Sequence, residues 1–110
     1  MLPKKNRIKK KSFPRSGKTL TGEFFTLKIS KSPEERFRGA VVVSKKISAK
    51  ATSRNKLRRQ VYEILRKESR AFVLNADIVV IARRGAENAT KKKIHDDVNS
   101  LLRASGILVK

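Results

Sequence analysis

The chain lacks cysteine altogether and contains a single histidine, His95. Without cysteine it has no disulfide, no thiolate zinc site and no cysteine nucleophile. One histidine excludes a multi-histidine metal site and argues against a serine–histidine–aspartate hydrolase. No apolar run approaches the roughly 18 residues of a membrane span, and no apolar stretch follows the basic N-terminus, as a secretory signal would require. We therefore expect a cytoplasmic protein with no membrane partner.

Acidic residues are scarce: 9 Asp and Glu against 29 Lys and Arg give a formal net charge of +20. The length of 110 residues fits one domain, residues 1–110, and the hydrophobic share of 38% is enough for a small core. Because so large a charge repels itself, we expect modest stability without a polyanionic partner. Nucleic acid is the commonest partner of this kind.

The positive charge is concentrated in two parts of the chain. Residues 1–18 contain eight basic and no acidic residues, together with two prolines, which predicts a mobile basic arm. Residues 45–70 contain ten basic and two acidic residues. A surface adapted only for solubility would intersperse the two signs. A merely solvated helix face is therefore the less favoured explanation of this second block.

Three segments have the hydrophobic pattern of β-strands. Residues 23–30 alternate with a period of two, which is typical of a half-buried strand, and we assign Phe25 to the core. Residues 37–44 and 77–83 contain uninterrupted apolar runs, which are typical of strands buried on both faces. A short further strand could lie between residues 45 and 48.

Two segments have the period of an amphipathic helix. One runs from Arg54 to about Glu68, with Thr52 or Ser53 as its expected N-cap. The other runs over residues 91–104, with Gly106 at its C-terminus. The residues expected to face inward are Leu57, Val61, Ile64, Leu65, Ile94, Val98, Leu101 and Leu102. The elements predict a single α/β (α+β) domain, a two-layer sandwich of one mixed sheet with helices packed on it.

The face of the first helix opposite its apolar stripe carries groups suited to RNA. Guanidinium groups bind phosphate bidentately. An asparagine can bond a base edge or a ribose hydroxyl, and a tyrosine can stack on a base. The preceding connection adds lysines beside the helix N-terminus, where backbone N–H groups attract anions. The RNA-binding candidates are Lys45, Lys46, Lys50, Arg54, Asn55, Lys56, Arg58, Arg59, Tyr62 and Arg66.

These residues resemble the signature of the bacterial ribonuclease P protein subunit. The signature runs Lys-Lys, a short Ala-containing stretch, then Arg-Asn-Arg-x-Lys-Arg-x-x-Arg-Glu. The identities are Arg54, Asn55, Arg59 and Glu63, with Lys45-Lys46 upstream and Ala51 at the usual alanine. Length and element order agree along essentially the whole chain. The sequence departs from the signature where Tyr62 and Lys56 each replace an arginine, and Pro14 interrupts the family's first helix.

The resemblance implies both a fold and a function. The family fold is a sandwich whose strand–helix–strand crossover is left-handed, whereas ~98% of such connections are right-handed. A large RNA subunit holds magnesium and cleaves precursor tRNA to release its 5′ leader. The protein binds that RNA and the leader, supports magnesium binding, and is not itself catalytic. The implied partners are the RNA subunit and precursor tRNA, with no obligate protein partner, no catalytic residue and no metal ligand.

The resemblance also implies a groove for the single-stranded leader. Phe24, Thr26 and Lys28 alternate on the outward face of the first predicted strand, where Phe13 could join them. Stacking is worth about 1–3 kcal/mol per base and needs little sequence preference, which suits variable leaders. Placement of Phe24 in the core, or exposed without a role, is an equally favoured alternative.

Two other functions compete with this hypothesis. A structural RNA-binding protein, such as a small ribosomal protein, would share the basic helix, but the ordered motif over residues 54–63 argues against it. A self-contained nuclease needs carboxylates or histidines gathered around a metal. His95 is better explained as an exposed helix residue, and Asp96 and Asp97 by the helix dipole. We expect Glu63 to form ion pairs along its helix with Arg59 and Lys67.

Overall fold

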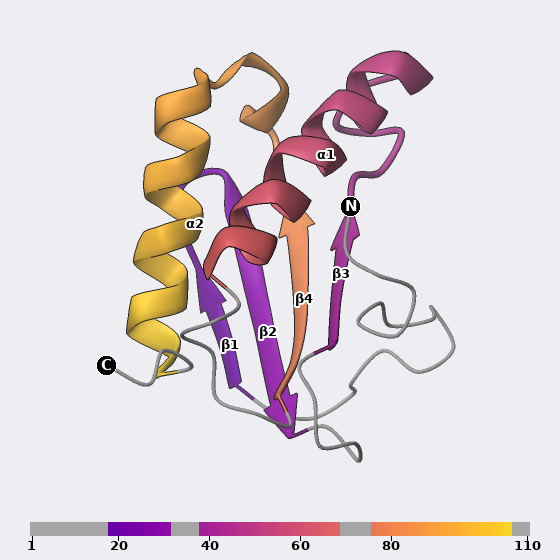
Figure 1. The fold of residues 1–110 in the computed structure, drawn as a ribbon. Coiled ribbons are helices and arrows are strands. Elements are labelled where there is room, and N and C mark those ends of the chain that lie inside the picture. The colour runs from indigo at the N-terminus through magenta and orange to yellow at the C-terminus, as the bar shows by residue number, and fades with distance from the viewer. Residues whose placement is uncertain (1–17, 32–37, 69–75, 107–110) are drawn as a thin grey trace.

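A four-stranded sheet with two helices on one face is the framework of the computed structural model (Figure 1). The structure describes residues 18–31, 38–68 and 76–106. The elements in chain order are β1 Lys18–Thr21, β2 Phe25–Lys31, β3 Arg38–Val42, α1 Ala51–Glu68, β4 Ala76–Ala82, the short 3-10 helix η4 Ala86–Asn88, and α2 Lys91–Ser105. The predicted two-layer α+β sandwich is confirmed.

The sheet has the strand order β1-β2-β4-β3. Strand β2 is antiparallel to both β1 and β4, whereas β3 and β4 are parallel and are joined through α1. In Figure 1 both parallel strands point upward, α1 passes in front of the sheet, and β4 lies to the left of β3. This path is a left-handed crossover, the exception to a rule that holds in ~98% of cases. It is the handedness that the family resemblance implies.

The core lies between the sheet and the two helices. Alternate residues of β2 and β4 face the helices, and Phe25, Leu27, Ile78 and Val80 are at most 1% exposed. Burying each such side chain contributes about 1.5–3 kcal/mol. All eight helix residues expected to face inward are buried: Leu57, Val61, Ile64, Leu65, Ile94, Val98, Leu101 and Leu102.

A second, smaller apolar cluster lies on the face of the sheet turned away from the helices. Val79 of β4 and Ala40 of β3 are 2% and 4% exposed, and Val42 and Ile81 pack against them. Strands β3 and β4 are therefore apolar on both faces, which accounts for their uninterrupted apolar runs.

Three local predictions are wrong. Residues 18–21 form β1, a strand that was not predicted; Lys18 was assigned to the arm. Helix α1 begins at Ala51, so Thr52 and Ser53 lie inside its first turn and neither is the N-cap. Residues 45–47 form a turn closed by Ile47 N–H donating to Ser44 O, and not a strand. The predicted mobile arm lies outside the described residues, except that Lys18 begins β1.

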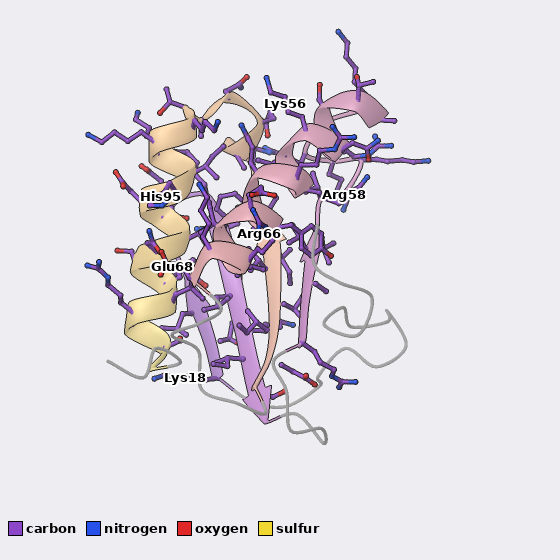
Figure 2. The ribbon with its side chains drawn as sticks, in the orientation of Figure 1. Lys18, Lys56, Arg58, Arg66, Glu68 and His95 are labelled. Carbon is purple, nitrogen blue, oxygen red and sulfur yellow. The ribbon has the colours of Figure 1, made fainter. Side chains whose placement is uncertain are left out.

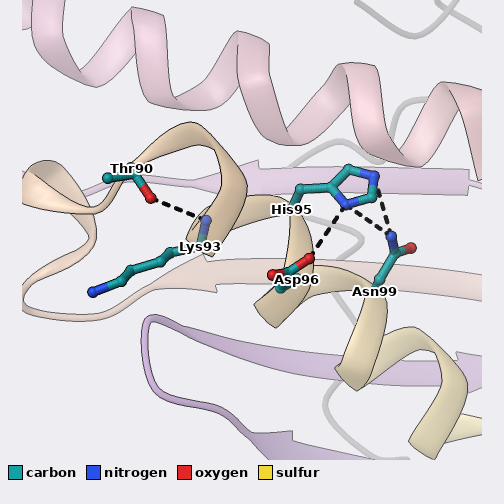
Figure 3. Close-up of polar contacts among 5 residues, drawn as sticks. All are labelled: Thr90, Lys93, His95, Asp96 and Asn99. Atoms are coloured by element: carbon teal, nitrogen blue, oxygen red, sulfur yellow. Dashed lines mark hydrogen bonds and ion pairs between the residues drawn. The ribbon is translucent and has the colours of Figure 1, made fainter.

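The ends of α2 follow the expected capping chemistry. Thr90 precedes the helix, and its Oγ1 accepts a hydrogen bond from Lys93 N at 3.2 Å (Figure 3). Gly106 follows the helix with a φ of 77°, a left-handed conformation that glycine adopts without steric cost. The predicted C-terminal glycine is confirmed.

The turn between β1 and β2 is fastened to α2 by one carboxylate. Asp97 Oδ1 accepts from Glu23 N and Asp97 Oδ2 accepts from Phe24 N, both at 3.1 Å. A Cβ on Gly22 would lie 2.6 Å from Asp97 Oδ1, so any larger residue there would displace the carboxylate. Asp97 therefore has a structural role, as the sequence analysis favoured, although the hairpin and not the helix dipole explains it.

Candidate nucleic-acid interface

Most of the RNA-binding candidates gather on α1 and on the loop that leads into it. Lys45, Lys46 and Lys50 of this loop are exposed. Figure 2 shows Lys56, Arg58 and Arg66 projecting from α1, with Lys18 at the opposite end of the molecule from Lys56. The loop and the helix thus present a cationic surface of the kind that RNA phosphates require. We call this set the α1 surface: Lys45, Lys46, Lys50, Arg54, Asn55, Lys56, Arg58, Arg59 and Arg66.

Arg54 connects the helix to the loop. Its Nη1 donates to Ser48 O and to Ala49 O, both at 2.9 Å, and its side chain is half-buried. Charged hydrogen bonds of this kind are roughly twice as strong as neutral ones. Arg54 therefore holds the loop that carries Lys45, Lys46 and Lys50, a positioning role that the sequence pattern did not reveal.

Asn55, Lys56, Arg58 and Arg59 form the middle of the α1 surface. Arg58 Nη2 donates to Asn55 Oδ1, so the two side chains support one another on adjacent turns. Asn55, Lys56 and Arg59 are exposed and Arg58 is partly exposed. The Asn55 amide nitrogen still carries donors suited to an RNA acceptor.

Glu63 pairs with a different residue from those expected. Arg66 Nη2 donates to Glu63 Oε2 at 2.9 Å, at a spacing of i, i+3, whereas pairs with Arg59 and Lys67 were expected. The hydrogen bond and charge of Arg66 hold the pKa of Glu63 below its usual value, and Glu63 raises the pKa of Arg66. Both side chains are about half exposed, so solvent screens the pair and it adds little stability.

Tyr62 is not on the α1 surface, which corrects the sequence analysis. It is 8% exposed, and its hydroxyl accepts a hydrogen bond from Val41 N at 3.2 Å. The physical reason is that Tyr62 follows Val61 directly and widens the apolar stripe by about 100° around the helix. A ring buried in this way cannot stack on an RNA base.

The candidates for leader binding do not share one surface. The sheet register places Thr26 opposite Ile81 and Lys28 opposite Val79, on the face turned away from the helices. Phe24 instead precedes β2, is half-buried, and packs against the core cluster on the helix side. A Cβ on Gly85 would lie 3.8 Å from its ring. The grouping of Phe24 with Thr26 and Lys28 is therefore wrong, and Phe13 lies outside the described residues.

A buried ion pair that the sequence analysis missed lies on the same outer face. Arg38 Nε donates to Asp77 Oδ1 at 2.8 Å and Arg38 Nη2 to Asp77 Oδ2 at 2.6 Å. The two residues are register partners on the parallel strands β3 and β4, and Asp77 is 3% exposed. An aspartate at the start of an apolar strand was the only signal, and its partner could not be read from the sequence.

The only histidine, His95, lies exposed on α2, as expected. Asn99 Nδ2 lies 3.1 Å from His95 Nδ1, and Asp96 Oδ1 lies 3.9 Å from the same nitrogen (Figure 3). Within residues 18–31, 38–68 and 76–106, no group of three or more His, Cys, Asp or Glu side chains is placed to hold a metal ion. None of the helices in these ranges is long and apolar enough to cross a membrane.

The fold and the surface together define an RNA-binding protein: an α+β sandwich with a left-handed crossover that displays a basic helix and loop. A sequence model of the family described as Ribonuclease P matches residues 2–105. The chain therefore belongs to the ribonuclease P protein family, and it is a subunit of a ribonucleoprotein enzyme of tRNA processing. The ribosomal-protein alternative is not favoured.

Individual relatives agree with this assignment. The chain is 29% identical to the ribonuclease P protein component of Exiguobacterium sibiricum, over 96% of this chain and 95% of the relative. It is 37% identical to that of Thermus aquaticus over 86% of this chain, and this match spans 54% of the longer relative. The solved structure of the Staphylococcus aureus RNase P protein superposes with a TM-score of 0.84 at 27% identity, covering 94% of this chain and 97% of that one.

Proposed function

We propose that this chain binds the catalytic RNA subunit of ribonuclease P and assists it in removing the 5′ leader from precursor tRNA. The observation that carries the proposal is the α1 surface, an ordered set of cationic side chains and Asn55 on a helix and a loop joined by Arg54. A rigid helix holds its charges at fixed spacing, so an RNA backbone of matching shape binds to it without the cost of ordering the protein first.

The protein acts by positioning and charge neutralisation, with the chemistry left to the RNA. Lys and Arg side chains neutralise RNA phosphates and displace the counterions condensed on the RNA. The lower phosphate charge reduces the repulsion between two RNA strands. Magnesium ions perform the same neutralisation, so the protein lowers the magnesium concentration that the RNA subunit requires. The ions themselves are bound mainly by the RNA subunit and the substrate.

The unpaired 5′ leader lies along the outer face of the sheet in this proposal. Thr26 and Lys28 offer a hydroxyl and a cation on that face, beside the partly exposed Ile81. These groups bind backbone and bases without distinguishing sequence, which suits leaders of variable sequence. Binding of the leader favours precursor over mature tRNA, because only the precursor carries it.

Magnesium titration of the cleavage reaction tests the proposed function. Nuclease-treated protein is added to a bacterial ribonuclease P RNA with precursor tRNA, and correct 5′ maturation is followed at each magnesium concentration. We expect the protein to shift half-maximal cleavage to lower magnesium, and to cleave nothing without the RNA. Unchanged magnesium dependence, or cleavage by the protein alone, would contradict the proposal.

A further inference from the structure

A groove runs between α1 and the first turns of α2. The groove consists of three adjoining hollows, and Gln60 is the one residue that lines all three. The hollow at the α2 side has a volume of about 280 Å³ and an apolar floor of Ile64 and Ile94. Arg59 of α1 and Lys91 of α2 both line the same two hollows.

The rim of the groove is cationic. Lys56, Arg59 and Lys91 are exposed, and none of them forms an ion pair with another residue of the described ranges. Two acids also line the hollows, and both already accept hydrogen bonds. Glu63 accepts from Arg66, and Glu87 Oε1 accepts from Gly85 N at 3.2 Å. The groove therefore favours an anionic occupant.

The centre of the groove suits a nucleobase. The Gln60 amide offers two donors and an acceptor, the set that reads a base edge. Ile64 and Ile94 supply an apolar floor for a base face, and the exposed ring of His95 borders the same hollow. The volume of this hollow, about 280 Å³, is near the lower limit of about 300 Å³ for small-molecule sites, so it suits a single small group such as one base and not a longer segment.

We propose that this groove binds one unstacked RNA nucleotide, with its base against Gln60 and the isoleucine floor and its flanking phosphates on Arg59 and Lys91. The inference rests on the proposed function, since it takes RNA as the partner, and it extends the RNA-binding surface from α1 to α2. The nucleotide comes either from the RNA subunit or from the precursor tRNA. Both sources present the same chemistry.

Paired substitutions test the groove in the complex with ribonuclease P RNA. Gln60→Ala removes the central amide, Lys91→Gln removes one rim charge, and Lys92→Gln removes the same charge from a neighbouring residue that lines none of the hollows. We expect Gln60→Ala to weaken binding about fivefold to tenfold with an unchanged salt dependence. We expect Lys91→Gln to weaken binding and to lower the slope of log K against log salt by about 0.7. Lys92→Gln should bind as the unsubstituted protein does.

Two results would overturn the inference: RNA binding by Gln60→Ala equal to that of the unsubstituted protein, or equal losses of affinity for Lys91→Gln and Lys92→Gln. Thermal unfolding of each variant separates a folding defect from a defect in RNA binding. If the unsubstituted protein lowers the magnesium requirement while the groove variants match it, the groove inference fails and the proposed function stands. If the unsubstituted protein itself has no effect, the proposed function fails.

Cross-linking distinguishes the two sources of the nucleotide. Because the chain has no cysteine, Gln60→Cys provides one attachment point for an azidophenacyl group, and Lys92→Cys provides its control. Cross-links from position 60 to the RNA subunit in the absence of precursor tRNA identify the RNA subunit as the source. Cross-links that appear only when precursor tRNA is added identify the substrate. No cross-link above the level of the control in either case would contradict the inference.

Discussion

The hydroxyl of Tyr62 on α1 accepts a hydrogen bond from the backbone N–H of Val41 on β3 at 3.2 Å. Strand β3 is at the edge of the sheet that residues 18–31, 38–68 and 76–106 form, and β4 is its one partner among these strands, so one side of its backbone pairs with none of them. The bond satisfies one of these edge N–H groups inside the core, where an unsatisfied donor costs about 1–3 kcal/mol. Tyr62 is thus a link between helix and sheet.

Replacing Tyr62 tests this role. Tyr62→Phe keeps the ring and removes the acceptor, so we expect the free energy of unfolding to fall by about 1–2 kcal/mol. The affinity for ribonuclease P RNA at matched salt and magnesium should not change, because the ring is buried. Urea denaturation and a binding titration provide the two measurements. A large loss of affinity with unchanged stability would restore Tyr62 to the RNA-binding surface.

Arg54 and Arg59 belong to the same motif, and we expect them to respond differently to substitution. Arg59→Ala removes an exposed side chain and should leave stability within about 0.5 kcal/mol while weakening RNA binding. Arg54→Ala also removes a charged donor from Ser48 O and Ala49 O, so it should cost about 1.5–3 kcal/mol as well as affinity. The two substitutions combined should weaken assembly further. Denaturation curves that coincide for the two single variants would argue against the positioning role of Arg54.

The adjacent acids Asp96 and Asp97 form a matched pair for a test of the hairpin anchor. Asp97→Ala removes the acceptor of two backbone N–H groups, and we expect a loss of about 1.5–3 kcal/mol. Asp96→Ala, at an exposed position, should change stability by less than about 0.5 kcal/mol. Unfolding is measured with and without magnesium, and the difference between the variants should be the same in both. A loss that appears only with magnesium would indicate an ion site in place of a hairpin anchor.

The ion pair of Arg38 and Asp77 allows a prediction about buried charge. Asp77→Ala leaves the Arg38 guanidinium, whose side chain is 14% exposed, without this carboxylate and should cost about 3–5 kcal/mol. Arg38→Met with Asp77→Leu removes both charges and should cost less than Asp77→Ala alone. Urea denaturation of the single and double variants measures the difference. If the double variant is less stable than Asp77→Ala alone, the ion pair contributes more to stability than the mutual neutralisation of two buried charges.

The helices could be predicted from the sequence because their signal is local and periodic. A repeat of apolar residues over 15 positions places Leu57, Val61 and Leu65 on one stripe whatever they pack against, and Gly106 marks the C-terminus of α2 by its own conformational freedom. The long apolar run of β4 is likewise a local signal, and it predicts a central strand. The handedness of the crossover has no local signal, and only the resemblance to a family supplied it.

The features that the sequence did not reveal depend on pairing between distant residues. Strand β1 has four residues, too few for a period to show, and exists because β2 pairs with it. The partner of the Tyr62 hydroxyl, the N–H of Val41, is 21 residues away along the chain, so no local pattern indicated it. Gln60 carries no charge and matches no motif, so nothing marked it before α1 and α2 were placed side by side.

The most direct test of the central claim compares two equal reductions of charge. One variant changes Lys56, Arg58 and Arg59 to Gln on the α1 surface, and the other changes Lys18, Lys92 and Arg103 to Gln at exposed positions outside it. The affinity for ribonuclease P RNA is measured for both as a function of salt at constant magnesium. The account predicts that the slope of log K against log salt falls by about 0.7–0.9 for each phosphate that the protein no longer neutralises, and that it falls only in the first variant. Equal slopes and equal affinities for the two variants would contradict it.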